Sequence, residues 1–469
     1  MNSLAMRNRC AKQRQEGIFR GDLRMQEKGH LLRVLGLVFG FAVVIGSVVG
    51  QGILRTPGIV AEASGSTPVL LGLWVLGALV ALVSAIPLAE LGAAIPRAGG
   101  YFSYAARGLG ENAGVLFAMT ALTMGVTNQA QLIYVLGEFM FRFGVGGGDW
   151  SPGWLGTIAI LGMCLYSALG TRINGASQIV LSALKGAFLI GLVVVFFAGP
   201  AGASPEAPGS GGGLLAFGIA MLVITGTYNG WGDLVFFGEE IRDPGRSIPR
   251  ALFGGILAVA VLYLLINAAI LYVLTPAGAA GSEFAAADAA LKAFGPNGDF
   301  VLTLFGILSV GAISILALMI NTRYAYAAAR AGILPRVLSS VSERGSPNLA
   351  MLAVVAPTIA FVLTGSYITI AATTISLSEV VYLSICASYF ALRKSEPDME
   401  RPWRAPWHPW PALIAALIHL ALLAWFIWSD PVNSILGMAL VGAMMLGYLL
   451  LANGKSNLAE LSHVTKDIA

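Results

Sequence analysis

The stretch IGSVVGQGILRTP, Ile45–Pro57, lies in the first long apolar segment of the chain and decides how the remainder is interpreted. It places three glycines beside the polar residues Ser47 and Gln51, near the middle of that segment. Glycine weakens a helix by about 1 kcal/mol relative to alanine. A broken helix also leaves backbone groups that lipid cannot satisfy, so breaks occur only where they are buried in protein or face water. The stretch therefore predicts a membrane helix that is interrupted.

A second stretch of the same kind, TGTYNGWGD, occupies Thr225–Asp233 in the sixth apolar segment. A single glycine pair can be ordinary helix packing. Two interrupted segments at corresponding positions in two halves of a chain instead indicate the substrate site of a transporter. We therefore interpret these two stretches as the two sides of one site.

The composition indicates a membrane protein, because 57% of the residues are hydrophobic, only 11% are charged and the mean hydropathy is +0.78. Soluble proteins average about 25% charged residues. About twelve apolar runs approach the ~20 residues that a membrane helix needs. The expected fold is all-α and polytopic, with spans near residues 31–61, 69–95, 113–140, 154–170, 178–198, 213–238, 250–275, 300–321, 349–364, 367–391, 411–428 and 432–452.

Charge predicts the orientation of these spans. Residues 1–30 carry seven Lys and Arg residues and no apolar core, which is typical of a cytoplasmic tail and not of a signal peptide. Alternate loops are also basic, whereas the opposite loops carry chiefly Arg142 and Lys292. Because basic loops stay in the cytoplasm, we expect both termini to be cytoplasmic.

A loop rich in Gly, Pro and Ser at residues 199–212 divides the spans into two halves. An odd number of spans in each half inverts one half relative to the other, which is the inverted-repeat arrangement with a site at the membrane midplane. The expected organisation is a basic tail (1–30), a first five-helix repeat (31–200), a second, inverted five-helix repeat (213–392), two additional helices (405–452) and a cytoplasmic tail (453–469).

Two facing helix breaks can bind an α-amino acid without charged side chains. Free N–H groups carry partial positive charge and suit a carboxylate, whereas free carbonyls suit an ammonium group. We expect N–H groups from Gln51, Gly52 and Ile53, and carbonyls from Val48, Gly226 and Asn229. A valine at Gly52 would then fill the carboxylate site. The full predicted substrate set is Val48, Gly50, Gln51, Gly52, Ile53, Gly226, Asn229, Gly230, Trp231 and Asp233.

Two ionisable residues within spans have competing interpretations. Lys185 in the fifth span is a functional candidate because an ionisable group is costly in the membrane. Alternatively, its long side chain extends to the surface. Asp233 either meets the second ammonium group of a polyamine or pairs with a neighbouring polar or basic residue.

Other polar residues argue against an enzyme or a channel. We expect Glu90 to be paired or interfacial, and Glu239 and Glu240 to form salt bridges, because no nucleophile accompanies them. Three cysteines and four histidines are scattered without the spacing of a metal site, so neither metal nor cofactor is expected. A channel would show a repeated filter or rings of charge, and none is evident.

Six stretches of the chain form a set of motifs: GSVVGQGILRTPG (Gly46–Gly58), PRAGGYFSYA (Pro96–Ala105), YNGWGDLVFFGEEIRDPGRSIPRA (Tyr228–Ala251), NTRYAYAAARAGILP (Asn321–Pro335), SPNLA (Ser346–Ala350) and RPWRAPWHP (Arg401–Pro409). Together these motifs resemble the amino acid–polyamine–organocation superfamily of permeases, and its L-type amino acid transporter-like branch in particular. The similarity runs in the family's order from about Leu31 to Gly447.

The resemblance implies the leucine-transporter fold, two inverted five-helix repeats followed by two helices, and transport of amino acids or related amines by alternating access. Lys185 lies where many sodium-independent members have a lysine in place of a sodium ion. Its implied role is to link the first break to the eighth span, with proton-coupled symport or amino acid exchange in place of sodium coupling. A polyamine or cationic-amine carrier of the same superfamily is the alternative.

Two positions depart from the family pattern. Gly226 stands where many L-type relatives have a bulky aromatic gate, and Asn229 stands where they often have glycine. The loop at 141–152 contains no cysteine, so no disulfide-linked heavy chain is expected. The chain also has no N-x-S/T site, which fits a protein of a bacterial inner membrane. The expected partners are the lipid bilayer and a small-molecule substrate, with no nucleic acid.

Overall fold

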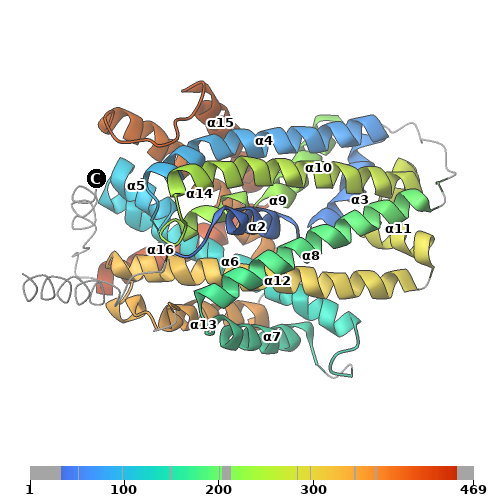
Figure 1. Cartoon of the computed structure of the whole chain (residues 1–469), viewed down its shortest axis with the longest axis horizontal. Helices are drawn as coiled ribbons and strands as arrows, with labels where there is room; N and C mark the ends of the chain where they lie inside the picture. The colour runs from blue at the N-terminus through green and yellow to red at the C-terminus, as the bar shows by residue number, and fades with distance from the viewer. Residues whose placement is uncertain are drawn as a thin grey trace, which may run out of the picture.

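The described residues of the computed structural model form a bundle of α-helices (Figure 1). The description covers residues 33–50, 52–97, 99–147, 150–199, 201–202, 213–282, 284–295, 297–342, 345–364 and 367–451. The two predicted tails and Gln51 lie outside these ranges. Within them, strand pairing is limited to an isolated bridge between Leu35 and Ile241.

The helices correspond in order to the predicted spans. Seven are long and apolar enough to cross a membrane by themselves, judged on the described residues. These seven are α4 (Thr67–Ala94), α8 (Thr171–Ala198), α10 (Pro244–Ala279), α12 (Asn297–Arg330), α14 (Tyr367–Ser395), α15 (Trp410–Ser429) and α16 (Pro431–Leu451). The chain is therefore an all-α, multi-pass membrane protein.

The other predicted spans are short, polar or broken. The third is α6 (Glu111–Arg142), and the fourth and ninth are the shorter α7 (Pro152–Ser167) and α13 (Asn348–Thr364). The first is divided into α2 (Leu37–Val48) and α3 (Gly52–Ser64). The sixth is divided into α9 (Gly213–Tyr228) and the 3-10 helix η1 (Trp231–Phe237). Both predicted interruptions are thus present.

Shorter helices connect the spans. Helix α5 (Tyr101–Leu109) follows α4, and its buried side chains are Tyr101, Phe102, Tyr104 and Ala105. Helix α11 (Ala285–Phe294) precedes α12, and the 3-10 helix η2 (Arg336–Ser339) follows it.

The two broken spans lie side by side in the middle of the bundle (Figure 1). Helix α2 packs against η1, and α3 packs against α9. Since α2 precedes α3 and α9 precedes η1, the two spans run antiparallel, and their breaks lie at the same level. The fold thus brings together two stretches that are about 180 residues apart in the sequence.

A cluster of buried aromatic rings supports the breaks from one side. Tyr228, the last residue of α9, packs against Trp74 of α4 and Tyr263 of α10, with ring centroids 5.9 and 5.2 Å away. All three side chains are at most 3% exposed. By contrast, α15 and α16 present apolar side chains such as Trp428 and Leu450 outward, as lipid-facing helices do.

Candidate substrate site

The first break follows Val48, where regular helical geometry ends. Val49 has the extended backbone angles φ −71° and ψ 97°, and helix α3 begins three residues later at Gly52. The last carbonyls of α2 and the first N–H groups of α3 consequently have no partners within their own helices. These are the groups that the sequence predicts for binding the two charged ends of an amino acid.

Lys185 binds the carbonyl side of this break. Its Nζ donates hydrogen bonds to the carbonyl of Gly46 at 3.0 Å and to that of Val49 at 3.2 Å. The side chain is 3% exposed, so it does not extend to the surface. A buried ammonium group is tolerable only when polar groups replace its water, and the broken helix supplies them.

The contact of Lys185 differs from the expected one in one respect. Both hydrogen bonds reach the first span, and none joins Lys185 to the eighth span, α12, within the described residues. Helix α12 nevertheless packs against both α2 and α8. A direct link from Lys185 to the eighth span therefore stays a prediction.

The second break is stabilised by neutral groups. Gly230 adopts the left-handed conformation with φ 105°, which separates α9 from η1. The amide oxygen of Asn229 accepts the N–H of Gly230 at 2.7 Å and the hydroxyl of Tyr382 at 2.5 Å. Tyr382 belongs to α14, so a third span holds this break in place.

The two breaks touch one another. A Cβ atom on Gly230 would lie 3.0 Å from both Cβ and the carbonyl oxygen of Ser47. A Cβ atom on Gly52 would lie 2.8 Å from Oγ1 of Thr227. Thr227 also shares a 2.7 Å hydrogen bond with Thr56 of α3. Glycine is needed at both positions because the neighbouring span comes so close.

This packing corrects one expectation about Gly52. The space beside Gly52 is filled by Thr227, so a valine there would push the two spans apart. The Gly52→Val variant would therefore not test carboxylate binding separately from the packing of the two spans. Ile53, the next predicted residue, has a fully buried side chain, and a Cβ on Gly50 would lie 2.7 Å from Cδ1 of Ile313 on α12.

Two predicted carbonyl groups already have intramolecular partners. The hydroxyl of Tyr263 donates to the carbonyl of Val48 at 2.8 Å and lies 3.3 Å from that of Thr227. The carbonyl of Gly226 accepts the N–H of Asn229 at 3.2 Å. Gly226 itself is exposed, and a Cβ atom there would meet nothing within 4 Å. The open side of the sixth span therefore lies at Gly226, as the departure from the family pattern suggests.

Trp231 and Asp233 lie just beyond the second break on η1. The buried ring of Trp231 stacks on Tyr382, with centroids 5.4 Å apart. Asp233 is half-buried beside the Ser47 hydroxyl. It forms no ion pair with any residue in the described ranges. Its neighbour is thus the polar Ser47 and not a basic residue, and whether Asp233 also binds a substrate ammonium group stays a prediction.

The tyrosines at the breaks were not identified from the sequence. Tyr263 and Tyr382 both lie in apolar helices and both use the hydroxyl to bind the broken spans. A buried tyrosine hydroxyl usually has a hydrogen-bond partner, so tyrosines within spans were the available signal. The presence of a tyrosine in a span does not reveal which group accepts its hydrogen bond.

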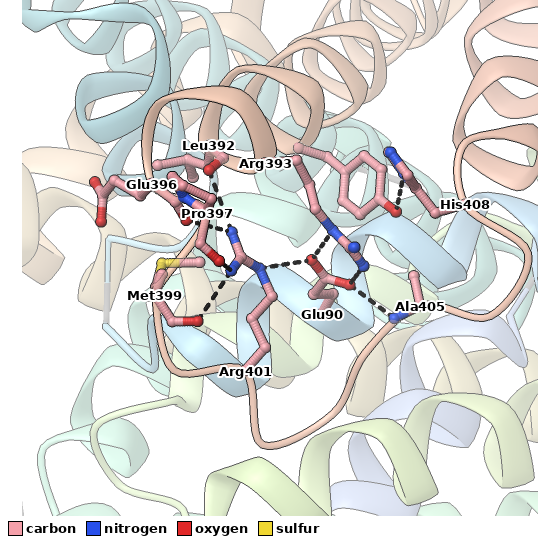
Figure 2. A network of polar contacts seen from close by, with 10 residues as sticks. Glu90, Leu392, Arg393, Glu396, Pro397, Met399, Arg401, Ala405 and His408 are labelled. Carbon is pink, nitrogen blue, oxygen red and sulfur yellow. Dashed lines mark hydrogen bonds and ion pairs between the residues drawn. The ribbon is translucent and has the colours of Figure 1, made fainter.

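The carboxylates expected to form salt bridges do so at one end of the bundle. Glu90 of α4 is 1% exposed and binds Arg393 of α14, Arg401 and the N–H of Ala405 (Figure 2). Arg401 also donates to four backbone carbonyls around the end of α14 (Figure 2). The network therefore fastens the connection between α14 and α15 to α4.

Glu239 and Glu240, just after η1, form a second network on the same side. Glu240 pairs with Arg323 of α12, both side chains being buried, and Glu239 pairs with Arg330 at 2.8 Å. These carboxylates lock the end of the sixth span to the eighth. Both networks lie at the ends that the charge pattern predicts to be cytoplasmic, and neither lies at the breaks.

Comparisons with known proteins show the family of the chain. The family model for amino acid permeases matches residues 35–452. The serine/threonine exchanger SteT of Bacillus subtilis (strain 168) is 28% identical over 402 residues, covering 83% of this chain and 90% of that protein.

Two mouse proteins are similar over comparable lengths. The large neutral amino acids transporter small subunit 2 is 28% identical, covering 88% of this chain and 79% of that protein. The b(0,+)-type amino acid transporter 1 is 27% identical, covering 86% and 84%. These relatives are transporters and not enzymes. The chain belongs to the amino acid permease family of the amino acid–polyamine–organocation superfamily.

Proposed function

We propose that this protein is a sodium-independent secondary transporter of neutral amino acids that works by alternating access. The observation that carries the proposal is the pair of facing breaks, one of which holds the Lys185 ammonium group on two carbonyls. The Lys185 amine occupies these carbonyls by hydrogen bonding, which leaves no need for a metal cation there. Coupling would then come from protons or from exchange of one amino acid for another.

In this proposal the substrate carboxylate binds the first N–H groups of α3, at Gly52 and Ile53, and the substrate ammonium group binds carbonyls at the second break. Helix N-termini attract anions and C-termini attract cations, so the two antiparallel breaks suit a zwitterion. Gln51 belongs to the proposed site but lies outside the described residues. The open space at Gly226 and the polar side chain of Asn229 set the shape and polarity of the remaining wall.

Two of the three relatives support neutral substrates, since their names refer to serine and threonine or to large neutral amino acids. The polyamine alternative rests on Asp233, the half-buried carboxylate beside the second break. We also propose inverted repeats at 31–200 and 213–392, cytoplasmic termini and a bacterial cell membrane. A disulfide-linked heavy chain is not expected, because residues 141–152 contain no cysteine.

The test uses purified protein in liposomes. A thermal-shift panel of amino acids and polyamines selects ligands, and the best ligand is then followed as labelled uptake with or without internal unlabelled amino acid. The proposal predicts stabilisation and uptake of a zwitterionic neutral amino acid. Stabilisation by polyamines alone would contradict it and would assign substrate recognition to Asp233.

A further inference from the structure

A buried glutamate–histidine pair lies in the middle of the membrane-spanning helices. Glu379 is near the centre of α14, and His419 is near the centre of α15. Nδ1 of His419 lies 2.7 Å from Oε2 of Glu379, and the two side chains are 9% exposed or less. Within the described ranges, His419 is the only basic partner of Glu379.

The charge of this pair depends on one proton. When the proton is bound, the pair has no net charge. It is then either an imidazolium beside a carboxylate or a neutral imidazole beside a carboxyl group. Without it, a carboxylate remains uncompensated among apolar helices, which is costly. Two groups this close exchange protons as one unit, so the pair is best regarded as a single proton-binding site.

The second contact of His419 suits both protonation states. Nε2 lies 3.1 Å from Oγ of Ser84, a buried residue on α4. A hydroxyl group can accept a hydrogen bond from protonated Nε2 or donate one to unprotonated Nε2. A carbonyl at this position would serve only the protonated state. The serine therefore allows the proton to be bound and released without leaving an unsatisfied group.

A row of stacked rings joins the pair to the second break. The ring of His419 stacks on Tyr382, with centroids 4.7 Å apart and planes inclined by 19°. Tyr382 in turn stacks on Trp231 and donates its hydroxyl to Asn229. A change in the charge or position of the imidazole thus acts directly on the side chain that holds the broken sixth span.

Other titratable groups lie on the helices around the glutamate–histidine pair. Asp233 of η1 lies within electrostatic reach of Tyr382, as does Tyr101 of α5. Glu90 of α4 binds arginines at the end of the bundle. The other ionisable residues on the helices packed against α14 and α15 are Tyr104 and Arg107 of α5, Glu111, Tyr134, Glu138 and Arg142 of α6, and Tyr448 of α16. Helix α14 itself also carries Tyr367, Cys386, Tyr389, Arg393 and Lys394.

We propose that Glu379 and His419 bind the proton that drives transport, and that Tyr382 passes the protonation state of the pair to the second break. The proposal rests on the proposed function and selects proton coupling over pure exchange. In the described part of the chain, the side-chain hydrogen bonds of Glu379 and His419 join them to each other and to Ser84, and none reaches a proposed substrate residue.

The test separates proton coupling from transport itself. In liposomes, an inward proton gradient should accelerate uptake of the amino acid, and uptake should acidify the lumen as read by a trapped pH dye. For Glu379→Gln and His419→Gln, the ratio of gradient-driven uptake to amino acid exchange should fall about tenfold. The controls are Glu111→Gln on exposed α6 surface and His408→Gln in the loop before α15, both expected to keep the wild-type ratio.

Two results would overturn the proposal: wild-type uptake that ignores the gradient, or a wild-type ratio in Glu379→Gln. A protein that moves no amino acid would contradict the proposed function, and a second readout then decides the proton site. The infrared difference spectrum between acid and neutral pH should contain carboxyl and imidazole bands that Glu379→Gln lacks. Identical spectra would contradict proton binding by the pair.

Discussion

The two helix breaks are built from different chemistry. In the first, a charged amine from another span holds two backbone carbonyls. In the second, an asparagine binds the neighbouring N–H group and a tyrosine holds the asparagine. A charged contact in the membrane is costly to remove, whereas a neutral contact can be exchanged at small cost. We infer that the first break is the fixed part of the site and that the second is the adjustable part.

The largest expected effect comes from Lys185→Ala. Loss of two charge-assisted hydrogen bonds should cost about 3 kcal/mol, corresponding to a reduction in uptake of about 100-fold. The measurement is initial uptake in liposomes at matched protein content. Lys394→Ala, at an exposed position near the end of α14, is the control. Uptake near the wild-type rate in Lys185→Ala would remove the distinction between the two breaks.

The next effect separates two glycines of the sixth span. Gly230→Ala forces a side chain into the left-handed conformation and against Ser47, so we expect a loss of about 2 kcal/mol in stability. Gly226→Ala has open space and lies within α9, where alanine favours the helix by up to about 1 kcal/mol, so it should keep or raise stability. Thermal unfolding of both purified variants is the measurement. Equal melting temperatures would show that the second break does not require its backbone geometry.

The smallest effect is expected for Tyr382→Phe. This change keeps both ring stacks and removes only the hydrogen bond to Asn229, worth about 1 kcal/mol or about fivefold in uptake. The matched control is Tyr134→Phe on α6, whose ring packs against a separate apolar cluster that includes Ile133 and Ile160. A loss of uptake in Tyr382→Phe as large as that in Lys185→Ala would mean that the second break is as rigid as the first.

The location of both breaks followed from the sequence because glycine and polar residues within apolar runs have a direct physical meaning. The sequence also predicts that Glu90 is paired or interfacial and that Glu239 and Glu240 form salt bridges, and all three form ion pairs with arginines. The partners themselves were beyond prediction. Glu90 and Arg393 are 303 residues apart, and only the packing of α14 against α4 brings them together.

Glu379 and His419 show a different limit of sequence analysis. Both are ionisable residues in apolar helices, the same signal that singled out Lys185. The spacing of the histidines indicates only whether they could bind a metal together. It does not detect a histidine that pairs with a glutamate 40 residues away. The neutral contacts of Tyr263 and Tyr382 depend on side-chain direction, which hydrophobic patterning does not specify.

The most direct test of the account is the sodium dependence of uptake by the wild-type protein. Liposomes are assayed for uptake of the best-bound neutral amino acid in external sodium chloride and in external choline chloride, at the same pH and osmolarity. If the Lys185 ammonium group takes the place of a cation at the first break, the two rates will be equal. Uptake that requires sodium would contradict that assignment.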